Sequence, residues 1–254
     1  MTGDSQMDGK IQSVAVVVPA RDEAALICPC LDSLIAARAE VAVTHPAVDV
    51  TIVVVADACA DATEEIVRSY GDRGVDLAVV RVGRVGVARG IGIRRSLSSG
   101  DGPALRSAWI ANTDADSVVP ALWLTHQVEL ADAGADVMVG TVRPDPADLT
   151  ADQWARWTAT HERGRPNGHV HGANLGVRAS AYEAVSGFDP VAEHEDNLLV
   201  ARLRERGAVI VASDVAEVVT SGRPVGRTPG GYAAHLVEAL SDSREPGLEP
   251  QAAP

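Results

Sequence analysis

Short hydrophobic runs alternate with polar segments along the first half of the chain. Runs rich in Val, Ile and Ala predict buried strands, because a strand covered on both faces of a sheet is apolar throughout. These runs lie at 14–18, 50–55, 75–82, 109–111 and 136–142. Between them, apolar residues at helical spacing predict helices that begin near Pro29, Asp61, Gly90 and Pro120. The alternation of strands and helices predicts a doubly wound α/β fold.

The second half of the chain has a less regular pattern. Its expected elements are a helix around Trp154 and Trp157, a strand that crosses into a turn at 169–178, helices at 181–185 and 193–206, a strand at 208–212 and a helix at 232–240. We expect the two Trp side chains to pack together, because residues three apart share one face of a helix. The predicted organisation is a disordered leader at 1–10, a single domain at 11–240 and a disordered tail at 241–254.

An apolar run that starts at Trp109 ends in two carboxylates, Asp114 and Asp116. In an open α/β sheet the carboxyl ends of the strands face the ligand crevice, and alternate residues of an extended segment point the same way. Two hard oxygen ligands on one turn suit Mg²⁺ or Mn²⁺, which proteins often share with a substrate's phosphates. The alternative is a helix N-cap and its neighbour, since Asp is common there and Pro120 suits a helix start.

Composition and charge narrow the classes of partner. The formal net charge is −13, which argues against nucleic acid or an anionic membrane as the main partner. A phosphate-bearing substrate stays open, because a metal ion or a few arginines can reverse the sign inside a cleft. No apolar run approaches the ~20 residues of a membrane-spanning helix, and the polar N-terminus lacks a signal-peptide core. We therefore expect a cytoplasmic protein without an integral membrane segment; the sequence leaves a homodimer open.

Six blocks of sequence occur in a characteristic order. They are VVPARDE at 17–23, ADACADAT at 56–63, GVARGIG at 86–92, NTDAD at 112–116, GANLGVR at 172–178, and GFDP at 187–190 with ED at 195–196. Together they resemble the family 2 type of nucleotide-sugar glycosyltransferase with the GT-A fold, over residues 13–215. The resemblance implies a mixed, mostly parallel sheet with helices on both faces. It also implies a nucleotide-binding half at 11–142 and an acceptor-binding half at 143–240.

The resemblance implies a set of nucleotide-binding residues. They are Pro19, Ala20, Arg21, Glu23, Asp57, Arg89, Asp114 and Ala115. Asp57 would contact a uracil-type base, because a carboxylate suits an imide N–H group. Arg89 would bind phosphate oxygens bidentately, and its flanking glycines suit the close approach of a ligand. The alternatives are a turn residue for Asp57 and a solvated helix face for Arg89.

The same resemblance implies the metal site and the catalytic groups. Asp116 would be the principal ligand of Mg²⁺ or Mn²⁺, and Asp114 would contact the ribose or the metal. Asp196, with Glu195 beside it, would be the general base that deprotonates an acceptor hydroxyl for a single, inverting displacement. The alternative for both acids is that they complement the dipole of a helix start. The residues expected on the acceptor and sugar side are His171, Gly172, Ala173 and Asn174.

Several points stay open at this level. A third metal ligand could come from His171, His194 or His235. Arg223 and Arg227 could close over a diphosphate or belong to a solvated loop.

Departures from the family pattern and missing motifs bear on the choice of function. Ala56, Gly90 and Ser186 depart from the family pattern. The Gln-x-x-Arg-Trp motif of processive enzymes is absent, so the expected function is transfer of one sugar from a UDP- or GDP-sugar to a soluble or small-molecule acceptor. Alternatives are a non-catalytic nucleotide-sugar binding protein and, less favoured, a sugar nucleotidyltransferase.

Overall fold

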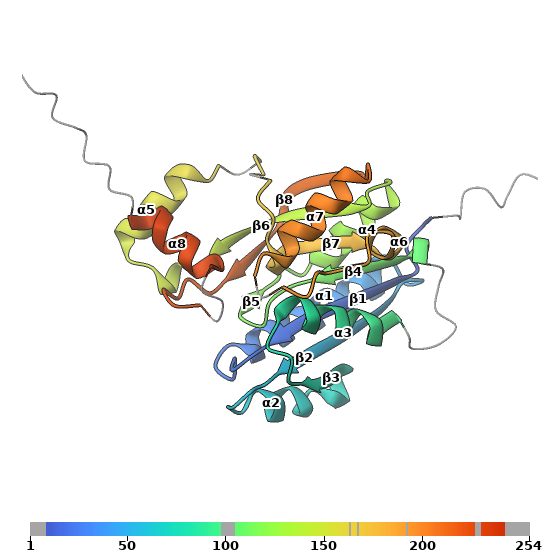
Figure 1. Ribbon diagram of the computed structural model, residues 1–254, viewed down its shortest axis with the longest axis horizontal. Coiled ribbons are helices and arrows are strands. Elements are labelled where there is room, and N and C mark those ends of the chain that lie inside the picture. Colours follow the sequence, from blue (N-terminus) through green and yellow to red (C-terminus); the bar gives the residue numbers. More distant parts are fainter. Residues whose placement is uncertain are drawn as a thin grey trace, which may run out of the picture.

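The computed structural model describes residues 9–97, 105–162, 164–166, 168–191, 193–226 and 230–241. The strands of these residues form one sheet in the order β3-β2-β1-β4-β7-β6-β8-β5 (Figure 1). Their bounds are β1 Ser13–Ala20, β2 Asp49–Asp57, β3 Val75–Val80, β4 Ala108–Asn112, β5 Ser117–Val118, β6 Val137–Pro144, β7 Leu175–Arg178 and β8 Ile210–Thr220.

The sheet is mixed but mostly parallel. β1 pairs in parallel with β2 and β4, β2 with β3, and β6 with β8. Only β7, which pairs with β4 and β6, and the two-residue β5, which pairs with β8, run antiparallel among the strands described. The expectation of a doubly wound, mostly parallel sheet is confirmed, and the carboxyl ends of β1, β2 and β4 meet at one edge.

Helices cover both faces of the sheet, as predicted. Their bounds are α1 Ile27–Thr44, α2 Thr63–Ser69, α3 Val85–Leu97, α4 Trp123–Asp132, α5 Ala151–Thr160, α6 Ala179–Ala184, α7 Glu195–Glu205 and α8 Tyr232–Ser241. In β1, Val14, Val16 and Val18 face the cluster that contains α1 and α4. Val17 faces the opposite cluster, which contains α3, α6 and α7. Both faces of β1 are therefore buried, which explains its continuous apolar sequence.

α5 and α8 lie together at one end of the molecule, beyond β6 and β8 (Figure 1). The rings of Trp154 and Trp157 stack with centroids 5.3 Å apart, and Trp157 stacks on His161 at 4.1 Å. Trp157 also joins Leu236 and Leu240 of α8 in a small apolar cluster. The prediction that the Trp pair packs is confirmed, since these contacts hold α5 against α8.

Several elements differ from what the sequence predicts, among them β7, which begins only at Leu175. α3 begins at Val85, so the glycine-rich block belongs to the helix and does not form a loop before it. β8 extends to Thr220, because the residues beyond 212 alternate between buried and more exposed positions and lack a continuous apolar run. The short strand β5 was not predicted; it pairs Ser117 with Thr220 and so brings the end of β8 beside the turn after β4.

The predicted leader and tail fall largely on residues 1–8 and 242–254, which lie outside the described residues. The division of 11–240 into two functional halves stays a prediction. Within the described ranges, no helix combines the length and the apolar character that crossing a membrane would require.

Gly92 lies where α3 packs closest to the sheet. A Cβ atom there would lie 2.6 Å from Val17 Cγ1 and 2.9 Å from Val55 Cγ2, whereas a Cβ at Gly90 would have its nearest contact at 3.4 Å, with the end of the Arg94 side chain. We therefore expect Gly92→Ala to lower the free energy of unfolding by about 1–3 kcal/mol, the usual cost of overpacking a core. Gly90→Ala is the matched control and should leave it unchanged or raise it by up to about 1 kcal/mol, because alanine favours a helix. Urea denaturation measures both; equal effects would contradict this account of the packing.

Candidate active site

The carboxyl ends of the parallel strands open into a cavity of about 900 Å³. Residues from all six sequence blocks except the GFDP segment line it, although they are far apart in the chain. Of the residues that the sequence marked, the lining contains Pro19, Ala20, Arg21, Glu23, Asp57, Arg89, Asp114, Ala115, Asp116, His171, Gly172, Ala173, His194, Glu195, Asp196, Arg223 and His235. The structure therefore brings the expected donor, metal and catalytic residues to one place.

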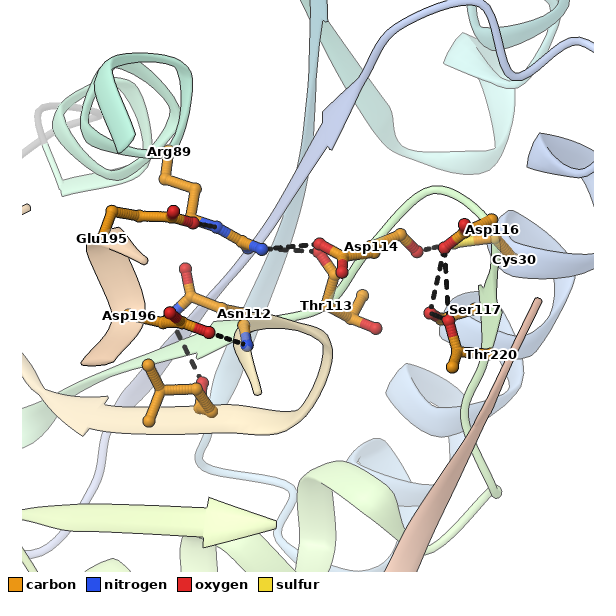
Figure 2. Close-up of polar contacts among 12 residues, drawn as sticks. Cys30, Arg89, Asn112, Thr113, Asp114, Asp116, Ser117, Glu195, Asp196 and Thr220 are labelled. Carbon is orange, nitrogen blue, oxygen red and sulfur yellow. Dashed lines mark hydrogen bonds and ion pairs between the residues drawn. The ribbon is translucent and has the colours of Figure 1, made fainter. Parts of the chain in front are cut away.

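Arg89 lies between the turn after β4 and the start of α7 (Figure 2). Its Nη2 donates to Asp114 Oδ1 at 2.5 Å, its Nε to Glu195 Oε1 at 3.2 Å, and its Nη1 to the Thr113 carbonyl at 3.3 Å. The side chain is only 2% exposed. Burial alone would lower the pKa of the guanidinium, but the carboxylates of Asp114 and Glu195 raise it, so Arg89 stays charged.

This placement differs from the expected contact between Arg89 and phosphate. Each nitrogen of the buried guanidinium already donates to the protein, so Arg89 joins two parts of the site. The glycines around Arg89 also serve packing: a Cβ at Gly86 would lie 2.5 Å from the Asp189 carbonyl oxygen. A Cβ at Gly172 would lie 2.5 Å from Arg89 Nη2, so this position has room only for glycine.

Asp116 lies on the other side of the same turn and faces the end of β8. Its Oδ1 accepts hydrogen bonds of 3.4 Å from the hydroxyls of Ser117 and Thr220, which also contact each other (Figure 2). Its Oδ2 lies 2.9 Å from Arg223 Nη2. Burial and the nearby charge of Asp114 raise the pKa of Asp116 to about 6, although Arg223 opposes the shift. Negative charge at this turn is therefore only partly compensated.

Arg223 also forms a forked ion pair with Glu23. Its Nη1 lies 2.8 Å from Glu23 Oε2 and its Nη2 lies 2.7 Å from Glu23 Oε1. The two residues are 200 positions apart, and no local pattern in the sequence announces their contact. Arg227, the second arginine of the predicted loop, lies outside the described residues.

Asp57 closes the far side of the cavity at the end of β2. The residue is 5% exposed, and its Oδ1 accepts hydrogen bonds from the backbone N–H groups of Val82 at 2.7 Å and Gly83 at 3.0 Å. These bonds fix the loop between β3 and α3 at the cavity rim. Asp57 thus has the turn role of its alternative interpretation, while the contact of its carboxylate with a base stays a prediction.

Asp196 and Glu195 start α7 and point toward the cavity from different depths. Asp196 Oδ2 accepts a 2.7 Å hydrogen bond from the Gly172 backbone N–H, and its Oδ1 accepts one of 2.7 Å from the Asn197 backbone. Glu195 is 5% exposed, and burial raises its pKa against the opposing effect of Arg89. Asp196 is therefore the more accessible acid, held in place by Gly172, while Glu195 anchors the helix start to Arg89.

Three imidazoles gather at the end of the cavity next to α8. The ring of His169 lies 6.3 Å from that of His171 and 6.1 Å from that of His235, and Tyr232 meets His171 edge-on at 5.7 Å. Burial lowers the pKa of His171 to about 4, so its ring is neutral near pH 7. The third metal ligand among His171, His194 and His235 stays a prediction.

Asn174 differs from its expected place on the sugar side of the cavity. It is 1% exposed and does not line the cavity. Its Nδ2 donates to the carbonyls of Thr141 and Ala216, and its Oδ1 accepts from Trp123 Nε1 at 2.8 Å. Asn174 therefore ties β6, β8 and α4 together beneath the cavity, because both polar atoms of its amide already bind protein groups.

Sequence reasoning missed several cavity residues that occupy ordinary helix and loop positions. They are Arg84, Glu193, Asn197, Arg204, Tyr232 and Glu238. No spacing or composition signal marks them, because their place in the site depends only on how α3, α7 and α8 pack.

The donor chemistry of the β4 turn fits a divalent cation. Asp114 and Asp116 supply hard carboxylate oxygens, and burial together with the charge of Asp114 raises the pKa of Asp116. Asp114 is 38% and Asp116 16% exposed at the side chain, so both are within reach of the cavity.

Another cluster of potential ligands lies away from the β4 turn. In the part of the chain that the structure describes, only Asp22, Cys59 and Asp61 place three ligand atoms within 4.8 Å of one another. Their carboxylates accept backbone hydrogen bonds from Ala60 and Ala24, and so brace the loops after β1 and β2.

Comparison with known proteins agrees with this geometry. The sequence profile described as glycosyl transferase family 2 matches residues 15–188, which is most of the chain. The chain belongs to glycosyl transferase family 2. A search of curated protein sequences finds no match for this family member.

Solved structures with a similar fold support the assignment of the GT-A fold. S. aureus TarS 1–349 in complex with UDP-GlcNAc is 14% identical, with a TM-score of 0.62 over 91% of this chain and 66% of that one. A Pyrobaculum calidifontis mannosyltransferase in complex with GDP-Man and Mn²⁺ is 20% identical, with a TM-score of 0.58 over 86% of this chain and 59% of that one. M. tuberculosis glucosyl-3-phosphoglycerate synthase is 18% identical, with a TM-score of 0.52 over 91% of this chain and 77% of that one. The family 2 chain thus spans less than two thirds of the first two structures.

Arg89 is expected to carry a large share of the stability of the site. Arg89→Met leaves the buried carboxylate of Glu195 and the partly buried Asp114 without their partner, so the free energy of unfolding should fall by about 3–5 kcal/mol. Arg95→Met is the matched control, because Arg95 pairs with Asp76 on the surface and about half of each side chain is exposed. The control should change stability by less than about 1 kcal/mol. Urea denaturation at pH 7.5 compares them, and a loss no larger for Arg89→Met than for the control would disprove the role of Arg89.

Asp116 is expected to lower stability near neutral pH. Its pKa rises from 3.8 to about 6 on folding, so the folded state holds the proton more tightly and wild-type stability falls as the pH rises from about 4 to about 6. Asp116→Asn does not ionise. Its free energy of unfolding relative to wild type should therefore increase across this window, by no more than about 3 kcal/mol. Denaturation from pH 4 to 8 measures this, with the exposed Asp152→Asn as the control for loss of one carboxylate. Parallel curves for wild type and Asp116→Asn would exclude the shift.

Proposed function

We propose that this family 2 protein is an inverting glycosyltransferase that moves one sugar from a UDP- or GDP-sugar to a hydroxyl group of a small or soluble acceptor. The observation that carries the proposal is the convergence of Asp57, Asp116 and Asp196 on one cavity. These carboxylates come from the end of β2, the turn after β4 and the start of α7. A sugar nucleotide needs a place for the base, the diphosphate and the attacking hydroxyl, and each carboxylate suits one of these.

Structures with a similar fold support the choice of donor. TarS was solved with UDP-GlcNAc, and the P. calidifontis mannosyltransferase with GDP-Man and Mn²⁺. In this chain, Pro19, Ala20 and Asp57 would border the nucleoside, because they lie at the ends of β1 and β2. Arg21 and Arg84 also line the cavity and could offset the charge of a diphosphate.

Asp114 and Asp116 would hold a Mg²⁺ or Mn²⁺ ion, which when bound would neutralise the diphosphate that leaves. The remaining chemistry belongs to the side chains of the protein. Asp196 Oδ2 would take the proton of the acceptor hydroxyl, and the Gly172 N–H bond of 2.7 Å orients that carboxylate. The hydroxyl oxygen then forms a bond to the anomeric carbon as the bond from that carbon to the diphosphate oxygen breaks, which inverts the carbon.

A non-catalytic nucleotide-sugar binder is the competing function. It would use the same donor half but would not need an acid at the start of α7. Asp196 is accessible and oriented by a backbone hydrogen bond, which favours the enzyme. A nucleotidyltransferase remains less favoured, because the segment after β1 is Pro19–Glu23 and carries no glycine-rich loop.

The role of Asp196 can be tested without knowing the acceptor. Water can replace the acceptor hydroxyl, so we expect slow, Mn²⁺-dependent hydrolysis of UDP-GlcNAc or GDP-mannose by the wild-type protein. Asp196→Asn should lower this rate by at least about 100-fold, the range of general-base catalysis. Calorimetry should show donor affinity within about threefold of wild type, because the donor half is intact. Liquid chromatography of the released nucleoside diphosphate measures the rate of hydrolysis.

Asp152→Asn serves as the matched control, since Asp152 is exposed in the first turn of α5 and outside the cavity. It should keep wild-type hydrolysis and binding. Donor binding without hydrolysis by the wild-type protein would favour the non-catalytic binder. Failure of UDP and GDP sugars to bind with either metal would reject the proposal as a whole.

A further inference from the structure

The contact between Arg223 and Asp116 lies at the carboxylate that the proposed function assigns to a metal ion. Arg223 Nη2 is 2.9 Å from Asp116 Oδ2, and the guanidinium also forks onto both oxygens of Glu23. One guanidinium thus bridges two carboxylates, one from the segment after β1 and one from the turn after β4. The Arg223 side chain is 25% exposed, so the contact lies at the cavity wall and within reach of a ligand.

The charges around this contact explain why it forms. Asp114, Asp116 and Glu23 bring three carboxylates to one side of the cavity. Arg89 compensates the charge of Asp114 through an ion pair. Arg223 forms ion pairs with both Asp116 and Glu23. In the ligand-free protein, Arg223 is therefore the counter-cation of this carboxylate group.

We propose that Arg223 and a divalent metal ion compete for Asp116, so that metal binding requires Arg223 to leave Oδ2. A Mg²⁺ ion binds a carboxylate oxygen at about 2.1 Å, and a guanidinium nitrogen at hydrogen-bond distance from the same oxygen would meet the ion or its water ligands. When Nη2 leaves Asp116, Arg223 Nη1 can stay bound to Glu23 Oε2, so the guanidinium keeps a carboxylate partner.

The backbone around Arg223 is held separately from this contact. The Gly222 N–H donates to Asp148 Oδ2 at 2.7 Å, and the Ser221 N–H donates to the Asp116 carbonyl at 3.2 Å. A change at the guanidinium therefore leaves the end of β8 in place. Arg223 sets the affinity of the metal site, and it does so before any nucleotide arrives.

This inference rests on the proposed metal-dependent function, but it is tested by metal binding alone. Electron paramagnetic resonance counts free Mn²⁺ in a titration of the whole protein at pH 7.5, without nucleotide or sugar. Arg223→Gln should bind Mn²⁺ between about 5-fold and 100-fold more tightly than wild type, the usual range of coupling between two sites.

Arg143→Gln is the matched control. Arg143 lies on β6 near the same sheet edge and pairs with Glu217 at 3.3 Å, and it does not line the cavity. The control removes the same charge, so its Mn²⁺ affinity should stay within about twofold of wild type. If Arg223→Gln does not fold, Arg223→Lys replaces it, because one ammonium cannot fork onto both carboxylates. A smaller rise in Mn²⁺ affinity is then expected.

Unchanged or weaker Mn²⁺ binding in the Arg223 variants would overturn the competition and leave the proposed transferase intact. An equal rise in Arg143→Gln would also overturn it, because it would show a general effect of net charge. If no variant binds Mn²⁺, Asp116 is not a metal ligand and the competition is wrong. Donor binding by calorimetry then decides separately whether the proposed function survives.

Discussion

The buried guanidinium of Arg89 is the interaction on which the site depends. It connects Asp114, in the turn that follows β4, with Glu195, at the first position of α7. These elements are far apart in sequence, and the Arg89 side chain contacts both of them. Because the side chain is almost fully buried, its charge and the charges of its partners are stable only together. Arg89 thus joins the turn after β4 to the start of α7, and the Gly172 N–H bond then orients Asp196.

The cavity concentrates acidic groups in a chain whose net charge is already −13. Such a cavity would repel a nucleoside diphosphate if its carboxylates faced it uncompensated. The structure compensates them in two different ways. Arg89 is locked behind the β4 turn by three hydrogen bonds, whereas Arg223 reaches in from the end of β8 and is partly exposed. Arg89 fixes the geometry of the site, whereas the guanidinium of Arg223 can be replaced by another cation.

Much of this site could be predicted from the sequence, because short local patterns mark the strands and the acids that follow them. A continuous apolar run such as 14–18 marks a buried parallel strand, and the acids that follow such runs must lie at one edge of the sheet. This logic placed Asp114 and Asp116 at the cavity, and the family resemblance added Asp57 and Asp196. It could not predict the pairing of Arg223 with Glu23, which depends on how β8 and the β5 segment close the sheet.

Two residues expected to contact a ligand have protein partners for the same physical reason. Arg89 and Asn174 have side chains that suit ligands, and both lie within motifs of the family, yet both are at most 2% exposed and make hydrogen bonds to protein groups. A polar side chain in a motif can serve the ligand directly or can hold the backbone that does, and sequence alone does not separate these uses. Burial separates them, because a polar group sealed from solvent must satisfy its hydrogen bonds within the protein. By that criterion Asp114, Asp116 and Asp196 are the residues proposed to meet a ligand, while the side chains of Arg89 and Asn174 hold parts of the protein together.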